Sequence, residues 1–208
     1  MASNTGIQDV YDHVKQKIIS REFFPGNRIV EEDLASEMGT SRTTVRSAIS
    51  RLAFDGLVDV VPKKGTYVAK PTMEDMEEVY ELRRILESEA LRKAVPRIGE
   101  DALRRMEECI ADQVELEKHY NMQEYVKINR AFHSEIAKAS GNMYLEKFLD
   151  ELFNKTAIFL TFYDRSVTNL DSIETHTKIL EAIRKGDTEK AVEGIIEDNQ
   201  IAVDDIMI

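Results

Sequence analysis

The sequence predicts a mainly α-helical chain in two parts: a winged helix-turn-helix over residues 1–70 and an all-α antiparallel six-helix bundle over residues 71–208. Three observations lead to this prediction. Apolar residues recur at helical spacing through most of the 208 residues. Two short β-branched segments stand close together before residue 70, and no strand-like alternation follows them. The length is also sufficient for two small domains.

Three helices are expected before the β-branched segments. Helical spacing of apolar residues predicts the first over Ile7–Ser20, and the turn at Phe24-Pro25-Gly26 ends it. A short second helix is predicted over Glu31–Met38. Either Thr40 or Ser41 then caps a third helix, because a side-chain oxygen at that position accepts a bond from a free backbone N–H.

The two β-branched segments predict a hairpin. Leu57–Val61 and Thr66–Ala69 read as short strands, and Pro62–Gly65 reads as the turn between them. Two helices joined by a tight glycine-containing turn and followed by a hairpin form the outline of a winged helix-turn-helix.

The pattern after residue 72 is helical throughout. Lys70-Pro71-Thr72 reads as a linker whose last residue can cap the next helix. Pro96, Ser140-Gly141-Asn142 and Gly186-Asp187 supply breaks between helices. The six segments expected lie near residues 72–95, 100–119, 121–140, 142–163, 169–185 and 187–206. Helices joined by such short turns favour an antiparallel bundle.

Composition excludes several classes of protein. With 42% hydrophobic and 32% charged residues the chain can bury a core, so global disorder is not expected. One cysteine, Cys109, excludes an internal disulfide framework and fits a reducing compartment. Uninterrupted apolar runs are too short to span a membrane, and the N-terminus lacks the pattern of a secretory signal. The expected location is the cytoplasm.

The net charge of −11 is divided unevenly along the chain. Residues 1–70 hold 10 Lys and Arg against 9 Asp and Glu, whereas residues 71–208 hold 18 against 30. Phosphate binding needs cations, so the overall acidity argues against a nucleic-acid partner. The distribution matters more than the sum, and the near-neutral first part stays compatible with such a partner.

The start of the third helix carries the residues that predict DNA binding. Arg42, Thr43 and Thr44 form its first turn, and Arg46 lies four residues beyond Arg42 on the same face. The N-terminal end of a recognition helix enters the major groove, where arginine pairs with guanine or phosphate and threonine reaches phosphate. The alternative is an ordinary capped amphipathic helix with solvated arginines.

Lys63 and Lys64 stand at the predicted tip of the hairpin. Two ammonium groups there could contact a neighbouring groove or the phosphate backbone. The basic tip and the charge division favour the DNA-binding alternative over the solvated helix.

Residues 7–69 resemble the GntR family of bacterial repressors. The segments that carry the resemblance are Phe24-Pro25-Gly26-Asn27-Arg28-Ile29, Leu34-Ala35, Ser41–Leu52, Asp55-Gly56-Leu57 and Lys64-Gly65-Thr66-Tyr67-Val68. The resemblance implies that Arg42, Thr43, Thr44 and Arg46 contact operator DNA, and that the wing tip at Lys64-Gly65 reaches the minor groove. Where some relatives place an arginine for a base contact, this sequence has Glu31-Glu32-Asp33.

Residues from about 75 to 206 resemble the FCD domain of the FadR-like branch. The matching segments are Glu81-Leu82-Arg83, Leu86-Glu87, Asn129–His133, Ser140-Gly141-Asn142, His176, Ile179–Ile183 and Gly186-Asp187. Six helices rather than seven place it with the shorter, VanR-like type. The resemblance implies a bundle that binds small organic acids, in many cases with a divalent metal.

Four residues form the candidate metal site. Asn129 and His133 are four residues apart on one predicted helix, while His176 and Asp198 lie on the last two helices. Imidazole with carboxylate or amide oxygen suits Zn²⁺, Ni²⁺ or Mn²⁺. The family pattern is Asp-x-x-x-His with two further histidines, so Asn129 and Asp198 are departures from it. The alternative is a pair of hydrogen-bonded histidines in a helical interior.

Arg83 is the candidate effector-binding residue. It resembles the family arginine that faces the pocket from the first helix of the bundle. The alternative is a surface ion pair with Glu87, four residues further along the same helix.

These observations predict a homodimeric DNA-binding transcriptional regulator rather than an enzyme. A small carboxylate bound in the bundle would alter operator affinity. Because members of the family are mostly repressors, we expect this regulator to repress transcription. Two alternatives stay open. In one the bundle only dimerises; in the other it is a metal-dependent hydrolase, for which the sequence offers neither a nucleophile motif nor a glycine-rich phosphate loop.

Overall fold

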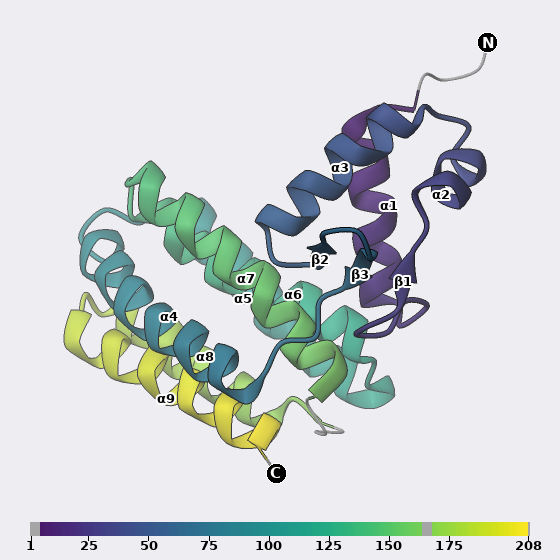
Figure 1. Cartoon of the computed structure of the whole chain (residues 1–208). Helices are drawn as coiled ribbons and strands as arrows, with labels where there is room; N and C mark the ends of the chain where they lie inside the picture. The colour runs from purple at the N-terminus through teal and green to yellow at the C-terminus, as the bar shows by residue number, and fades with distance from the viewer. Residues whose placement is uncertain (1–4, 164–167, 208) are drawn as a thin grey trace. The chain divides into compact units, whose positions relative to one another are not determined.

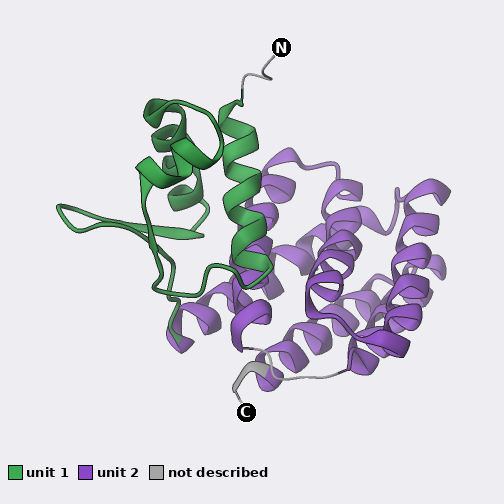
Figure 2. Ribbon diagram, turned by 90° about the vertical axis from the view of Figure 1, so that its right-hand side faces the viewer, with its two compact units in different colours: residues 1–72 green, residues 73–208 purple. Residues whose placement is uncertain are grey.

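The structure, a computed structural model, describes residues 5–163 and 168–207. It divides into two compact units, Met1–Thr72 and Met73–Ile208 (Figure 2). Among the described residues, the first unit combines three α-helices with a small sheet, and the second is a bundle of α-helices. The predicted fold class, mainly α with a winged helix-turn-helix and a six-helix bundle, is confirmed.

Three helices pack together in the first unit. They are α1 (Ile7–Ile19), α2 (Glu31–Glu37) and α3 (Arg42–Phe54). The buried faces of α1 and α3 carry Val10, Val14, Val45 and Leu52, all fully shielded from solvent. Apolar residues three or four apart lie on one side of a helix, so the same spacing that predicts these helices also forms the core between them.

The sheet of the first unit has three antiparallel strands in the order β1-β3-β2. β2 (Val58–Val61) and β3 (Gly65–Val68) form the predicted hairpin, with Val58 opposite Val68. The sequence prediction missed β1 (Arg28–Ile29), which places Arg28 opposite Tyr67. This third strand ties the hairpin to the chain that leads into α2.

The second unit holds six α-helices among its described residues. They are α4 (Met73–Ala94), α5 (Glu100–Leu116), α6 (Met122–Ala139), α7 (Met143–Tyr163), α8 (Leu170–Arg184) and α9 (Thr188–Met207) (Figure 1). A 3₁₀ turn, η1 (Glu117–His119), occupies the end of the segment predicted as one helix over 100–119. None of the helices in the described part of the chain is long and apolar enough to cross a membrane.

Within the bundle, α9 packs against α8 and α4, while α6 packs against α5, α7 and α4. Tyr80, Phe132, Leu149, Ile179 and Ile195 form part of its fully buried apolar core. A set of polar side chains is buried in the same interior: Arg83, Glu87, Gln113, His133, His176, Asp198 and Asn199. Burying polar groups is unfavourable unless they are paired, so their mutual contacts define a candidate site.

Candidate DNA-reading helix and candidate metal centre

The first turn of α3 is fixed by its cap. Ser41 is the N-cap residue, and its hydroxyl oxygen accepts a hydrogen bond from the Thr44 backbone N–H at 3.1 Å. This cap sets where the helix begins, and Arg42, Thr43 and Arg46 are exposed just beyond it. A helix N-terminus also carries partial positive charge, which favours contact with phosphate.

Two arginines of α3, Arg42 and Arg46, face acids of α2. Arg46 donates from Nε to Glu31 Oε2 at 2.8 Å, and Arg42 Nη1 lies 3.9 Å from Glu32 Oε2. The sequence identified these acids only as a departure from the family pattern. Their role as partners depends on how α2 packs against α3, which a helical pattern does not report.

The wing presents its two lysines at the predicted place. Lys63 and Lys64 are exposed in the turn between β2 and β3, and in the described part of the chain neither ammonium forms an ion pair. Gly65 has a φ of +122°, and a Cβ there would lie 3.2 Å from the Arg28 Nε. Glycine therefore suits both the backbone conformation and the close approach of Arg28 from β1.

Three of the four predicted metal ligands come together inside the bundle. His133 on α6, His176 on α8 and Asp198 on α9 place ligand atoms within 4.8 Å of one another. The Nε2 atom of His133 lies 3.3 Å from Asp198 Oδ2, and that of His176 lies 3.5 Å from Asp198 Oδ1. All three side chains are buried. Helices adjacent in space but distant in sequence thus bring together one carboxylate and two imidazoles.

Neighbouring polar groups orient the two imidazoles. The His133 Nδ1–H donates to Glu87 Oε2 at 2.6 Å, and the His176 Nδ1–H donates to Gln113 Oε1 at 2.8 Å. The Thr175 hydroxyl donates to Asp198 Oδ1 at 2.7 Å. These contacts turn both Nε2 atoms toward Asp198, as outer partners do around metal ligands.

The remaining polar capacity of the cluster fits a cation. The two Nε2 atoms are buried, and among the described residues neither has a partner in hydrogen-bond geometry. Two imidazole nitrogens and one carboxylate form a donor set that Zn²⁺, Ni²⁺ and Mn²⁺ accept. The chemistry of the residues present is therefore compatible with the metal that the family resemblance implies.

The electrostatics of the cluster differ between the two histidines. Burial lowers the pKa of His133, but the Glu87 and Asp198 carboxylates outweigh that effect and raise it to about 9. Burial lowers the pKa of His176 to about 3, with only partial compensation from Asp198. Burial raises the pKa of Asp198, yet the two histidines hold it well below its usual range. The centre thus favours one positive charge beside the carboxylate.

Asn129 is the fourth predicted ligand, and its placement is separate. It is buried on α6 and lines a small cavity of about 10 Å³, together with His133 and Arg83. Its amide forms no hydrogen bond with another described residue. That volume is about what one water molecule needs. Asn129 therefore shares a cavity with His133 but is not one of the three residues whose ligand atoms lie within 4.8 Å of one another.

Arg83 is paired with Glu87, but the pair is buried rather than on the surface. Its Nε donates to Glu87 Oε1 at 2.8 Å, and its Nη1 donates to Thr156 Oγ1 at 3.5 Å. The guanidinium carbon lies 5.1 Å from the ring centroids of both Tyr80 and Phe153. The surface ion pair considered as an alternative is therefore wrong about exposure, since Arg83 is only 2% exposed.

The sequence reasoning missed the central position of Glu87 and the part played by Gln113. Glu87 contacts both Arg83 and His133, so it joins the candidate effector residue to the candidate metal ligands. Gln113 lies on α5, 63 residues before its partner His176. The signals for Glu87 were its place in a segment that carries the FCD resemblance and its four-residue spacing from Arg83, whereas no local pattern marks Gln113.

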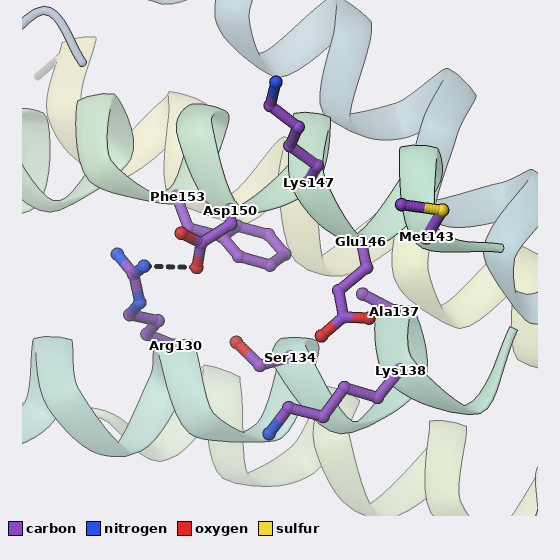
Figure 3. A pocket seen from close by; sticks show the side chains of 9 residues that line it. All are labelled: Arg130, Ser134, Ala137, Lys138, Met143, Glu146, Lys147, Asp150 and Phe153. Atoms are coloured by element: carbon purple, nitrogen blue, oxygen red, sulfur yellow. Dashed lines mark hydrogen bonds and ion pairs between the residues drawn. The ribbon is translucent and has the colours of Figure 1, made fainter. Parts of the chain in front are cut away.

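A groove of about 540 Å³ runs between α6 and α7 (Figure 3). Arg130 crosses it, donating to Asp150 Oδ1 at 2.5 Å and to Asn154 Oδ1 at 2.7 Å. Arg130 and Phe153 also line the small cavity beside Arg83 and His133. The open groove and the buried cluster therefore share a wall.

Comparison with known proteins agrees with both units. Residues 7–68 match the bacterial regulatory proteins of the gntR family, and residues 78–198 match the FCD domain. The HTH-type transcriptional regulator YdhC of Bacillus subtilis (strain 168) is 27% identical over 191 residues, covering 89% of this chain and 84% of that protein. The HTH-type transcriptional repressor GlaR of Escherichia coli (strain K12) is 26% identical over 200 residues, covering 89% and 88%.

Among solved structures, the McbR/YncC protein of E. coli has the same fold. It superposes with a TM-score of 0.85 at 22% identity, covering 97% of this chain and 96% of that one. The matched families and the two named relatives are those of transcriptional regulators rather than enzymes. The chain belongs to the GntR family of bacterial regulatory proteins, with a C-terminal FCD domain, and is a DNA-binding transcriptional regulator.

Proposed function

We propose that this regulator is a homodimeric, cytoplasmic repressor whose operator affinity changes when a small carboxylate binds in the helical bundle beside a divalent metal. The observation that carries the proposal is the buried trio of His133, His176 and Asp198, oriented by Glu87 and Gln113. One relative, GlaR, is named a transcriptional repressor, which supports repression as the sign of regulation.

The metal would be held by the two Nε2 atoms and the Asp198 carboxylate. A bound divalent cation would supply a positive charge to which the carboxylate of an effector can coordinate. This chain's own residues set the rest of the site: Glu87 and Gln113 fix the rings, and Arg83 offers a second cation near the cavity. Asn129 supplies an amide oxygen on the same cavity wall, a weaker ligand than a carboxylate.

Effector binding requires the bundle to open locally. The cavity beside Arg83 holds about 10 Å³, far less than even a small organic acid needs. The larger groove lies on the other side of Arg130 and Phe153, so displacement of these side chains would join the two spaces. A ligand that favours the opened arrangement of α6 and α7 shifts the population of the whole bundle toward it.

DNA binding is assigned to α3 and the wing. Arg42, Thr43, Thr44 and Arg46 would enter the major groove, and Lys63, Lys64 and Gly65 would approach the adjoining groove or backbone. A homodimer presents two such surfaces to the half-sites of a pseudo-palindrome. An effector that changes the relation between these surfaces changes operator affinity.

The DNA half of the proposal is tested by mobility shift on the region upstream of the protein's own gene. We expect retardation at micromolar protein and low salt, and weaker binding by Arg42→Ala and Arg46→Ala. Absence of retardation would count against operator binding there. Wild-type affinity in both variants would overturn the assignment to α3.

The metal and effector half is tested by thermal unfolding of chelator-treated protein. We expect Zn²⁺, Ni²⁺ or Mn²⁺ to raise the melting temperature, and small carboxylates to raise it further. His176→Ala should abolish the metal response, whereas the exposed His119→Ala should keep it. No response to any metal or acid would favour a bundle that only dimerises, and sedimentation analysis would then report the dimer alone.

A further inference from the structure

Two acids at the start of α2, Glu31 and Glu32, lie against Arg46 and Arg42 of α3. Glu31 pairs with Arg46 at 2.8 Å, and its side chain is 27% exposed against 65% for the arginine. Glu32 lies 3.9 Å from Arg42, and both of these side chains are mostly exposed. One acid is thus partly enclosed by the contact between the helices, and its partner reaches outward from α3.

The pairing leaves part of the Arg46 guanidinium available. Glu31 accepts from Nε, the donor nearest the backbone of the arginine side chain. Arginine has five N–H donors in a rigid plane, so the two Nη groups at the far edge remain free to donate. That far edge is the part that pairs with O6 and N7 of guanine.

The same pairing reduces the attraction of the arginines for phosphate. Non-specific binding to DNA depends on cations that neutralise phosphates, while hydrogen bonds to base edges carry the sequence information. A carboxylate beside each arginine offsets its charge but blocks neither Nη group of Arg46. In a helix-turn-helix the helix before the recognition helix crosses the phosphate backbone, and here it begins with Glu31, Glu32 and Asp33.

We propose that Glu31 is a specificity-determining positioning residue: it holds Arg46 by Nε with its far edge directed outward, and together with Glu32 it weakens binding to DNA of the wrong sequence. The inference rests on the proposed role of α3 in reading the operator. It assigns to the acids of α2 the function of discrimination between sequences, whereas the arginines supply the contacts.

The experiment compares two DNA probes bound by the full-length protein. One is a duplex selected by the wild-type protein from a random pool, and the other is a scrambled duplex of equal length and composition. We expect Glu31→Gln to tighten binding to the scrambled duplex about three- to tenfold at low salt, with a salt slope steeper by about one. The ratio of the two affinities should fall by a similar factor.

Two further variants separate charge from position. Glu31→Ala removes the acceptor as well as the charge, so it should also weaken binding to the selected duplex. Glu37→Gln is the matched control: Glu37 lies on the same helix but pairs with Lys17 and His13 of α1. It makes the same change in net charge without releasing an arginine of α3, and should leave the ratio near the wild-type value.

Two results would overturn the inference. One is an unchanged affinity ratio in both Glu31 variants, and the other is an equal fall in Glu37→Gln, which would reduce the effect to overall charge. Thermal melts of each variant establish that it is folded. Arg46→Ala separates the two proposals. If it binds the selected duplex like wild type, the role of α3 fails. If it binds that duplex weakly while both Glu31 variants keep the wild-type affinity ratio, only the role of Glu31 fails.

Discussion

Glu87 is the side chain on which the buried charges of the bundle converge. Its carboxylate accepts hydrogen bonds from Arg83, His133 and Asn199, which come from three different helices. Burial raises the pKa of Glu87, but the Arg83 guanidinium and His133 hold it below its usual range. A carboxylate so placed keeps Arg83 from being a buried charge without a counter-ion.

Glu87→Gln is therefore expected to lower the free energy of unfolding by about 3 kcal/mol, since it breaks a buried pair from one side. Urea unfolding at neutral pH, followed by circular dichroism, measures this. The matched control is Glu89→Gln on the same helix, where the carboxylate pairs with Lys93 at the surface. That variant should unfold close to wild type, because exposed pairs contribute little. Equal effects of the two substitutions would refute a central role for Glu87.

Cys109 is a buried thiol among acids. Burial raises its pKa to about 11, and the Asp112, Glu135 and Glu108 carboxylates add to the rise. Only the thiolate is nucleophilic, and a raised pKa means less thiolate at every pH below it. We expect alkylation by iodoacetamide to be slow at pH 8, and to accelerate roughly tenfold per unit of pH toward 11. Rapid alkylation at pH 8 in the folded protein would contradict this placement, whereas unfolding in urea should restore ordinary reactivity.

At the scale of the element, we expect the cap of α3 to link the stability of this helix to the proposed DNA binding. The Ser41 hydroxyl satisfies the Thr44 backbone N–H in the turn that carries Arg42. Ser41→Ala should lower the free energy of unfolding by about 1 kcal/mol and weaken binding to the selected duplex, since the first turn frays. Thermal melts and mobility shifts of the same preparation measure both effects.

Ser47→Ala provides the control within the same helix. The Ser47 hydroxyl donates to the Thr43 carbonyl oxygen. That oxygen lies inside the helix and already accepts a backbone hydrogen bond, so it does not need the hydroxyl. Alanine is the better helix former at an interior position, so this variant should be at least as stable as wild type. A loss in Ser47→Ala as large as in Ser41→Ala would show that the cap is not the cause.

The elements differ in how far the sequence predicts them. Helical spacing predicts the six helices of the bundle because each has an apolar face of several turns, as in α5 and α6. The sequence does not predict β1, because two residues are too few to show a periodicity. Its Arg28 pairs with Tyr67, which lies 39 positions later. The 3₁₀ turn at Glu117–His119 continues the helical pattern of α5, so its boundary is invisible in the sequence.

The sequence likewise predicts some residues of the candidate site and not others. The four-residue spacing and the family resemblance put Asn129, His133, His176 and Asp198 forward as ligands, and the structure brings the last three together. Their role in binding metal stays a prediction. The contacts of Gln113 with His176 and of Glu31 with Arg46 join different helices, so only the packing of those helices identifies them.

At the scale of the whole molecule, the acidity of the chain is concentrated in one part. Residues 71–208 carry 18 Lys and Arg against 30 Asp and Glu, while residues 1–70 carry 10 against 9. Repulsion between an acidic bundle and DNA disfavours binding through the bundle, so we expect the phosphate contacts to come from cations of the first part. Removing only a few lysines of the first part should therefore change how steeply DNA binding weakens with salt.

Substituting the two wing lysines tests this expected salt dependence. Lys63→Ala combined with Lys64→Ala should reduce the slope of log affinity against log salt by about two for the selected and the scrambled duplex alike, since each phosphate contact contributes about 0.9. Titrations at several salt concentrations measure the slope. The expected change is similar for both duplexes because a phosphate contact does not depend on base sequence.

A double variant in the bundle serves as the control. Lys185→Ala combined with Lys190→Ala removes the same charge from the acidic part, where these lysines pair with Glu181 and Asp187. If phosphate contacts are confined to the first part, this variant keeps the wild-type slope while its net charge equals that of the wing variant. Equal slopes for the two double variants would mean that salt dependence follows overall charge, and that the wing does not contact the backbone. A change confined to the selected duplex would instead assign Lys63 and Lys64 to reading bases.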